Sequence, residues 1–547
     1  MTKFCEDSSD YKPKRLVSMW KDITSTSVQI FSQGRIQNLD ETDSIIWRLI
    51  DGELTIRELS CKTNLQEEKI VNAIINWKKQ GIAILNSSPL SPTDELSDRI
   101  LIDGASLHHN VDVLFVVPPS PHANTRVNPT SNLHPLGIGY LMSVIERQSI
   151  YQCEALNLWN MNINEATIEY VLRVTNPKIL GLSVMTDNYQ NGVLIANIAK
   201  KVLPNTFIFM GGPHATFRGE EILASETNVD YILYGESELN IVPFLNAVLI
   251  GGGISSEIRG VIFRKNGEIC RGANTDLITT LDDLPYPNRG RDWFDKNDEV
   301  GIITSRGCPG RCIFCCASAM SGNKYRMRSP ESVADEIRYL YERGARNISI
   351  VDDTFTVSIP RMYKILSLIQ EMQLTGVRFS AESRVDVVDY DLNIFSELYK
   401  TGFRTIQFGV ESGSQVILEK LNKRITVKQI LTAVELASKA NLTPSCTMLI
   451  GHPYETTETI RESVLFAKRL VDLGAFVFFS VVTPYPGSKI GDHPDDYRLS
   501  VLSRSYDQYS TDNPIMELPN LSREEVREAF YDATIEIAKY CLRRRRR

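Results

Sequence analysis

Hydrophobic positions change their spacing along the chain, and the first region shows short helical and strand patterns. Ser27–Phe31 is strand-like, and Ile45, Ile46, Leu49 and Ile50 recur at helical spacing after Asp40 or Thr42, either of which can cap that helix. Two further short helices, Thr55–Cys61 and Glu67–Gln80, and a strand, Ile82–Leu85, complete the pattern. It predicts a small winged-helix-like module over residues 1–87, followed by a linker over 88–108.

From Val111 onward, continuous apolar runs alternate with amphipathic stretches. The expected strands are Val111–Val117, Ile179–Val184, Thr206–Met210 and Tyr231–Tyr234, and the expected helices are Ile138–Arg147 and Asn191–Val202. Buried strands that alternate with helices predict an α/β fold with a doubly wound, Rossmann-like parallel sheet. We place this domain at residues 109–255. A hairpin around Asn266-Gly267, together with a proline-containing connector, is expected over 256–297.

A third pattern repeats a strand, a loop and a helix six times. Its strands are Val300–Thr304, Ile348–Val351, Val377–Ser380, Thr405–Val410, Ser445–Ile450 and Phe476–Val482. Six units over residues 298–490 predict a partial (β/α)6 barrel rather than a full eightfold one. The remaining residues, 491–547, are polar, with one clear helix at Arg523–Cys541 and a basic tail, Arg543–Arg547, expected to be solvated rather than an anionic docking patch.

Composition narrows the possible environments of this chain. A net charge of −7 spread over 547 residues argues against a nucleic-acid partner. The longest apolar run, Ala475–Val482, is too short to span a membrane, and the polar stretch Met1–Trp20 is no secretory signal, so a cytoplasmic location is expected. Ten cysteines in such a chain indicate metal binding or buried thiols rather than disulfides.

Three of these cysteines form the spacing Cys308-x3-Cys312-x2-Cys315 just after the first barrel strand, where barrel active sites form. Nearby glycines let the backbone fold around a bulky group. Three thiolates suit a [4Fe–4S] cluster that keeps one iron open for S-adenosylmethionine. The alternative is structural zinc, which needs four ligands, but no second C-x2-C pair exists and Cys316 adjoins Cys315 too closely.

The cysteine spacing, with Phe314 before the last cysteine, resembles the signature of the radical S-adenosylmethionine (SAM) superfamily. Later segments, Ile348–Phe355, Ser380–Arg384 and Gly409–Gly413, are similar to its cofactor-binding strands. Taken singly, each acidic residue there reads more simply as a helix cap or surface charge. The resemblance implies SAM contacts from Asp352, Asp353, Ser380, Glu382, Arg384, Glu411 and Ser412. Tyr454, Glu455 and Tyr485 lie on loops that follow, with no role assigned to them.

The α/β domain before the barrel resembles the cobalamin-binding domain of B12-dependent radical SAM enzymes, and Pro135–Tyr140 opens its first helix as in that family. The implied cobalamin contacts lie at strand ends: Ser183, Thr186, Gly211, Gly212, Gly235 and Glu236. The Asp-x-His-x-x-Gly motif that supplies a histidine to cobalt is absent. The resemblance implies that cobalamin would bind without a protein histidine, and we expect His214 to be a hydrogen-bonding residue. A degenerate domain without cobalamin remains the alternative.

The stretch Leu39–Gly52 resembles the opening of a PqqD-like peptide-recognition element. The resemblance implies that the module binds the leader of a ribosomally made precursor peptide as an added strand. A DNA reader or an inert cap is the alternative, and the acidic side chains of Asp40, Glu41, Asp43 and Glu53 disfavour DNA.

Together the resemblances imply a class B methyltransferase-like peptide maturase. It would methylate an unactivated carbon by means of methylcobalamin and a 5′-deoxyadenosyl radical, with electrons from a donor such as flavodoxin or ferredoxin. A radical cyclisation, epimerisation or rearrangement without methylation is one alternative. A non-catalytic protein that binds cobalamin or peptide is another, and the intact cysteine triplet argues against it.

Overall fold

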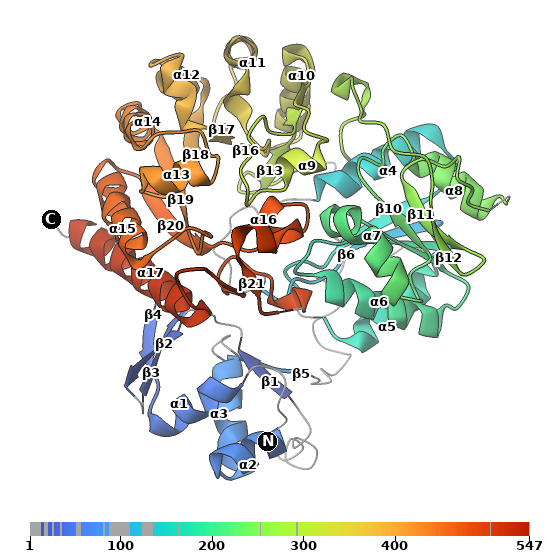
Figure 1. Cartoon of the computed structure of the whole chain (residues 1–547). Helices are drawn as coiled ribbons and strands as arrows, with labels where there is room; N and C mark the ends of the chain where they lie inside the picture. Colours follow the sequence, from blue (N-terminus) through green and yellow to red (C-terminus); the bar gives the residue numbers. More distant parts are fainter. Residues whose placement is uncertain are drawn as a thin grey trace.

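The computed structural model describes most of the chain in three regions (Figure 1). The described residues are 12–15, 20–24, 27–32, 35–50, 56–79, 83–86, 110–122, 135–161, 163–251, 253–290, 294–503 and 505–545. The linker predicted over 88–108 and the last two arginines of the basic tail lie outside them. No helix in the described residues is long and apolar enough to cross a bilayer.

The α/β domain is built on one seven-stranded sheet with the order β12-β11-β10-β9-β8-β6-β7. Five strands run parallel: β6 (Val113–Val117), β7 (Cys153–Asn157), β8 (Ile179–Ser183), β9 (Phe207–Gly211) and β10 (Tyr231–Leu233). The hairpin of β11 (Val261–Lys265) and β12 (Glu268–Arg271) adds to β10 antiparallel. The hairpin therefore extends the α/β sheet, although we expected it to stand beyond that domain.

Alternate residues of strand β6 explain why helices cover both faces of this sheet. Val113 and Phe115 pack into one hydrophobic cluster, with α4 (Leu136–Gln148) and α8 (Ile241–Leu249). Leu114 and Val116 pack into the other, with the helices α5 (Glu165–Thr175), α6 (Tyr189–Val202) and α7 (Pro213–Ser225). A strand that is apolar on both faces requires this double cover, and the predicted doubly wound arrangement is confirmed. Strand β7 and the helices α5, α7 and α8 were not predicted. Strand β7 is only partly buried and mixes polar with apolar residues.

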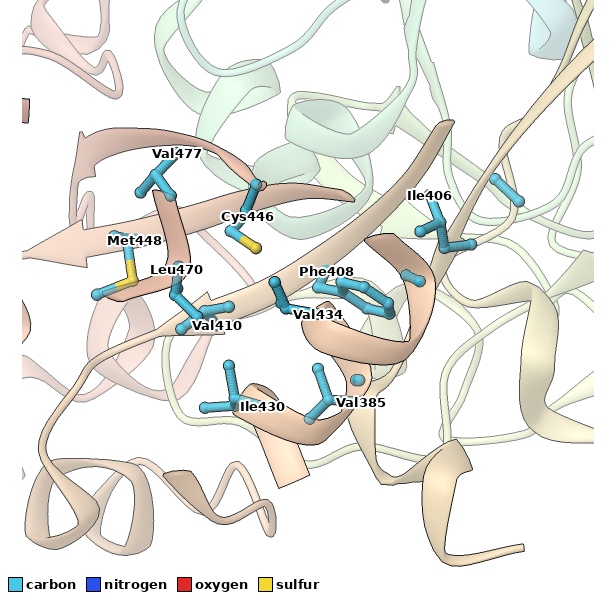
Figure 2. Close-up of a cluster of buried hydrophobic side chains, with 14 of the residues drawn as sticks. Val385, Ile406, Phe408, Val410, Ile430, Val434, Cys446, Met448, Leu470 and Val477 are labelled. Carbon is cyan, nitrogen blue, oxygen red and sulfur yellow. The ribbon is translucent and has the colours of Figure 1, made fainter. Parts of the chain in front are cut away.

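The second large region is an open, six-stranded parallel barrel in chain order, β13-β16-β17-β18-β19-β20. Its strands are β13 (Glu299–Ile302), β16 (Asn347–Ile350), β17 (Arg378–Ser383), β18 (Phe403–Glu411), β19 (Thr443–Ile450) and β20 (Phe476–Val481). Outer helices are α10 (Pro330–Glu342), α11 (Ile359–Glu371), α12 (Ile394–Thr401), α14 (Val427–Lys439) and α15 (Thr457–Asp472). Figure 2 shows part of the core, where Phe408 of β18 and Cys446 of β19 lie near Val434 of α14. The predicted partial barrel is confirmed.

Short elements complete the barrel. A two-stranded hairpin, β14 (Ser305–Arg306) with β15 (Arg326–Met327), follows β13, and its loop carries α9 (Ala317–Met320). Three further elements are α13 (Gln415–Lys420), α16 (Lys489–Asp492) and the pair β21 (Ser500–Val501) with β22 (Met516–Glu517). The C-terminal helix α17 (Arg523–Arg545) contacts α15 and β20 (Figure 1), so the predicted helical C-terminus is confirmed.

The N-terminal module combines a small antiparallel sheet with three helices. The sheet order is β2-β3-β4, with β2 (Trp20–Thr24), β3 (Ser27–Ser32) and β4 (Arg35–Asn38), and β1 (Lys12–Arg15) pairs with β5 (Ala83–Asn86). The helices are α1 (Glu41–Leu49), α2 (Ile56–Thr63) and α3 (Glu67–Lys79). Asp40 caps α1, as one of the two predicted caps. Trp47 and Trp77 meet edge to face, 5.2 Å apart, in the core of the module.

Candidate functional site

All three predicted ligand cysteines lie in the single loop that the β14–β15 hairpin closes. A Cβ placed on Gly310 would lie 3.2 Å from the sulfur of Cys308 and 3.9 Å from that of Cys312. The backbone N–H groups of Gly310 and Ala317 donate to the sulfurs of Cys308 and Cys315, each at 3.4 Å. Amide donors of this kind stabilise thiolates and tune the potential of a bound cluster. The sulfurs of Cys308 and Cys312 therefore lie close together beside Gly310, and Cys315 lies in the same loop.

The arrangement of the sulfurs fits a cluster with several irons. No three His, Cys, Asp or Glu side chains in the described residues surround a single ion. A cubane cluster binds each thiolate at a different iron, so its ligands need not converge on one point. The three cysteines differ in solvent exposure: Cys315 is exposed, whereas Cys308 and Cys312 are half-buried. Cys316 next to them is half-buried, and burial raises the pKa of its thiol.

A buried ion pair beside the cysteines was not anticipated from the sequence. The ammonium of Lys423 lies 2.6 Å from the carboxylate of Glu411, with 14% and 8% of the two side chains exposed. Glu411 has a positive φ of 66° at an irregularity in the β18–β19 ladder. Burial lowers the pKa of Lys423, but Glu411 and Cys312 outweigh this and raise it. Lys423 follows α13 in a polar loop, where no sequence pattern marks it as part of a site.

Arg384 adds a second cation on the same side of the loop. Its guanidinium pairs with Asp386 at 2.7 Å, and the Nη1 atom would lie 3.7 Å from a Cβ placed on Gly310. Burial opposes its charge, whereas Asp386, Cys308 and Cys312 favour it, and the net effect raises its pKa. The two cations offset the negative charge of a thiolate-bound cluster and can pair with a carboxylate ligand.

The carboxyl of Glu382 lies in the barrel among like charges. Burial, together with the nearby carboxylates of Asp353 and Glu411, raises the pKa of Glu382 to about 7, although Lys423 opposes the shift. The amide of Gln407 donates to Glu382 at 3.0 Å. Near neutral pH this carboxyl can be either protonated, and donate a hydrogen bond, or ionised, and accept one. Both forms can contact hydroxyl groups of a ligand.

The other predicted SAM contacts differ in how open they are. Asp353 is exposed and accepts one hydrogen bond, from the N–H of Gly307 at 3.1 Å. Asp352 is buried, and both its oxygens accept hydrogen bonds at 2.6 Å from Thr304 and Ser305. The hydroxyls of the two predicted serines are engaged with other serines, Ser380 with Ser349 at 2.6 Å and Ser412 with Ser463 at 3.1 Å. Asp353 is thus free to meet a ligand, whereas Asp352 ties β16 to the end of β13.

The loop after β19 packs a neutral histidine against the cysteine loop. The rings of His452 and Phe314 lie 5.7 Å apart, and burial lowers the pKa of His452 to about 3. Glu455 accepts hydrogen bonds from the N–H groups of Gly451 and His452, at 2.7 and 3.0 Å. These hydrogen bonds stabilise the loop after β19. Burial raises the pKa of Glu455 to about 7. Tyr454 and Tyr485 are half-buried at the same end of the barrel.

In the α/β domain, the loops after β6 and β8 meet at the point where the strand order reverses. There the hydroxyl of Ser120 donates to Asp187 at 2.7 Å, and the amide of Asn188 donates to the carbonyl of Pro118 at 3.0 Å. Ligands of open α/β sheets bind at this switch point. Ser183 and Thr186 belong to this edge of the sheet, as predicted.

Glycines at the ends of the neighbouring strands β9 and β10 allow the backbone segments to approach each other closely. Gly212 has a φ of 92°, and a Cβ there would lie 2.8 Å from the carbonyl oxygen of Val184. Gly211 ends β9, and Gly235, with a φ of 71°, follows β10 and donates its N–H to Thr216 at 3.0 Å. Small residues at these turns leave room for a large planar ligand to approach the backbone.

His214, next to these glycines, is buried between aromatic rings. Its ring lies 4.5 Å from those of Tyr189 and Tyr506, the latter from the C-terminal region. Nδ1 lies 3.2 Å from the hydroxyl of Thr186, and Nε2 has no hydrogen-bond partner in the described residues. Burial lowers the pKa of His214 to about 3, so the ring is neutral. The contact with Thr186 agrees with the predicted hydrogen-bonding role.

Glu236, predicted as a cobalamin contact, forms ion pairs with two arginines of the barrel. Its carboxylate lies 3.1 Å from Arg306 and 2.6 Å from Arg326, which belong to the hairpin around the cysteine loop. It also accepts the N–H of Ile278 at 2.9 Å. Both oxygens are thereby occupied within the protein, between the α/β domain and the barrel.

Comparisons with known proteins agree with this architecture. Residues 302–467 match the radical SAM superfamily and residues 125–242 match the B12-binding domain. The chain is 31% identical over 429 residues to an uncharacterized methyltransferase of Pyrococcus horikoshii, covering 77% of this chain and 91% of that one. It is 26% identical over 409 residues to the anaerobic magnesium-protoporphyrin IX monomethyl ester cyclase of Cereibacter sphaeroides, covering 72% and 65%.

Among solved structures, the fold matches the radical SAM methyltransferase TsrM of Kitasatospora setae. The TM-score is 0.58 at 18% identity, covering 70% of this chain and 76% of TsrM. The fold similarity, the two domain matches and the extent of the 31% identical relative point the same way. The protein therefore belongs to the radical SAM superfamily, in its B12-dependent, methyltransferase-like group.

Proposed function

We propose that the protein is a B12-dependent radical SAM methyltransferase that methylates a carbon of a ribosomally made precursor peptide. The methyltransferase part rests on its family, and the observation that carries the peptide part is the additional N-terminal module. When bound, the cluster, SAM and cobalamin supply a radical and a transferable methyl group. In this proposal the protein supplies the thiolates of Cys308, Cys312 and Cys315, and Asp353, Glu382 and Arg384 would hold SAM.

Strand addition is the mode of binding that the module supports. In its sheet, β3 is central, β2 lies on the side that contacts α17, and β4 is the opposite edge. Among the described residues β4 pairs with β3 alone. An extended peptide can continue a sheet from such an edge through backbone hydrogen bonds. The leader of the precursor would bind along Arg35–Asn38.

Hydrogen exchange tests this docking without altering the protein. The probes are synthetic peptides that correspond to short open reading frames beside the gene. A binding peptide is expected to protect the backbone amides of residues 35–38 and to leave those of β2 unchanged. Protection confined to the barrel, or no protection by any of these peptides, would refute leader binding at β4.

Product mass tests the reaction. Anaerobic incubation of the same peptide with protein, SAM, cobalamin and reductant is expected to add the mass of one CH2 group per event. A specific observation favours a second candidate, a radical reaction without methyl transfer, because one relative bears the name of a cyclase. An unchanged mass, or a loss of two hydrogens, would support that candidate and contradict methylation.

The one-electron donor is also part of the proposal. Exposed Arg311, Lys420 and Arg424 lie on two segments joined by a hydrogen bond of 2.9 Å from the amide of Asn422 to the carbonyl of Arg311. Cations beside the cysteine loop favour an acidic carrier of the flavodoxin or ferredoxin kind. The reduction rate with such a carrier is expected to fall as salt rises and as Arg311 is replaced by Glu; a rate unaffected by both would contradict this docking.

A further inference from the structure

Two arginines lie side by side at the closure of the cysteine loop. In the antiparallel β14–β15 hairpin, Arg306 stands directly opposite Arg326. All three ligand cysteines lie in the loop between these two residues. Like charges directly opposite each other on neighbouring strands destabilise the pairing. The hairpin therefore needs an anion between the two guanidinium groups.

The α/β domain provides that anion. Glu236 Oε1 lies 3.1 Å from Nη1 of Arg306 and 2.8 Å from Nη2 of Arg326, so one carboxylate contacts both arginines. Glu238 pairs with Arg306 at 2.6 Å, which makes a set of two cations and two anions. The four side chains are between 7% and 15% exposed, so water and salt screen them weakly.

The remaining contacts of this set also join the two regions. Arg306 lies over the ring of Tyr140 in α4, 5.2 Å from its centre. Arg326 donates to the carbonyl of Ile278 at 2.8 Å, and the N–H of Ile278 donates to Glu236. Glu236 itself follows Gly235 at the end of β10, the edge of the sheet where ligands of this fold bind.

We propose that Glu236 is a positioning residue for the cluster: by neutralising Arg306 and Arg326 it holds both ends of the cysteine loop together. The B12-binding domain thus helps to build the cluster site of the barrel, in addition to any role in binding cobalamin. Cys308 depends on this closure most, because it is separated from Arg306 by Gly307 alone.

The rate of iron loss tests this role without any substrate. Full-length protein with a reconstituted cluster is mixed anaerobically with a ferrous chelator. Glu236→Gln is expected to lose iron roughly tenfold faster than the wild type, with an altered EPR spectrum of the reduced cluster. The matched control is Arg218→Gln, which breaks another ion pair between the same regions, Arg218–Asp492 at 2.8 Å, and should stay within about twofold.

A double variant separates charge neutralisation from a simple loss of contact. Adding Arg326→Met to Glu236→Gln removes the repulsion from Arg306 and is expected to slow the iron loss again. A double variant that loses iron as fast as, or faster than, Glu236→Gln would overturn the proposal, as would wild-type behaviour of Glu236→Gln. If Glu236→Gln fails to fold, as judged by thermal unfolding, Glu238→Gln provides the test, with an expected intermediate rate; a wild-type rate would overturn the proposal.

Discussion

The two cofactor regions of this molecule differ in charge. Around the cysteine loop lie a buried Lys423–Glu411 pair, the cation of Arg384 and the carboxyl of Glu382. The edge of the α/β sheet instead presents glycine turns, hydroxyl groups and a neutral His214, and its carboxylates, Asp187 and Glu236, are bound within the protein. A thiolate-bound cluster and a zwitterionic ligand call for compensating charges, whereas a corrin calls mainly for space and hydrogen bonds. Each region is suited to a different ligand, and each can be disrupted separately.

Replacing Cys312 by Ala is expected to have the largest effect. It removes one of three thiolates, so the cluster should not form and all SAM cleavage should stop. Cobalamin binding should remain, because the α/β edge does not depend on this sulfur. Iron content and cobalamin absorbance on the same sample measure both, and a parallel loss of cobalamin would show that the two regions are not separable.

Replacing Lys423 by Met should come next. Glu411 would keep a buried charge without its partner, and we expect a loss of about 3 kcal/mol in the free energy of unfolding. The control is Lys400→Met, whose pair with Glu397 leaves 64% and 32% of the side chains exposed and should cost less than about 0.5 kcal/mol. Urea unfolding measures both, and equal losses would mean that the buried pair contributes nothing special.

The pH dependence of stability should also distinguish the two regions. The pKa of Glu455 is raised by burial to about 7, so the folded protein holds a proton that the unfolded chain releases near its ordinary pKa of 4.5. The contribution of Glu455 to stability is therefore fully present below pH 4.5 and falls by about 3 kcal/mol as the pH rises to 7. Glu455→Gln should flatten this slope, measured by urea unfolding of cofactor-free protein.

In contrast to stability, cobalamin affinity is expected not to depend on pH. With the pKa of His214 lowered by burial to about 3, this histidine stays neutral from pH 5 to 8. Affinity should therefore stay flat over that range, and a change near pH 6.5 would mean that His214 titrates as an exposed histidine does.

Replacing Gly212 by Ala should have the smallest effect, and that effect should be confined to the α/β domain. The new Cβ would meet the carbonyl of Val184 at 2.8 Å in a conformation with φ of 92°. We expect cobalamin affinity to fall roughly tenfold while cluster content stays unchanged. Equilibrium titration with cobalamin measures this, and an unchanged affinity would place the ligand elsewhere.

Much of the fold could be predicted because its signals are local. Strand β6 is apolar throughout and β16 through β20 repeat one unit, so the doubly wound sheet and partial barrel follow from periodicity. Strand β7 gave no such signal because its residues are only partly buried. The hairpin of β11 and β12 was predicted, but its pairing with β10 is a tertiary contact that no local pattern encodes.

The site shows the same division between local and distant information. Cys308, Cys312 and Cys315 fall within one loop, so their spacing alone identifies them. Lys423 reaches the cysteines from a distant loop, and Glu236 reaches Arg306 and Arg326 from another domain. Ion pairs between segments far apart in sequence depend on the finished fold, which is why Glu236 was assigned to cobalamin alone.

We infer that this one chain carries a cluster site and a separate cobalamin site. The most direct measurement is the iron and cobalamin content of anaerobically reconstituted wild type, Cys312→Ala and Gly212→Ala. We predict both cofactors in the wild type, cobalamin without cluster in Cys312→Ala, and a full cluster with weakened cobalamin in Gly212→Ala. A wild type that takes up iron but no cobalamin, or variants that lose both together, would contradict the claim.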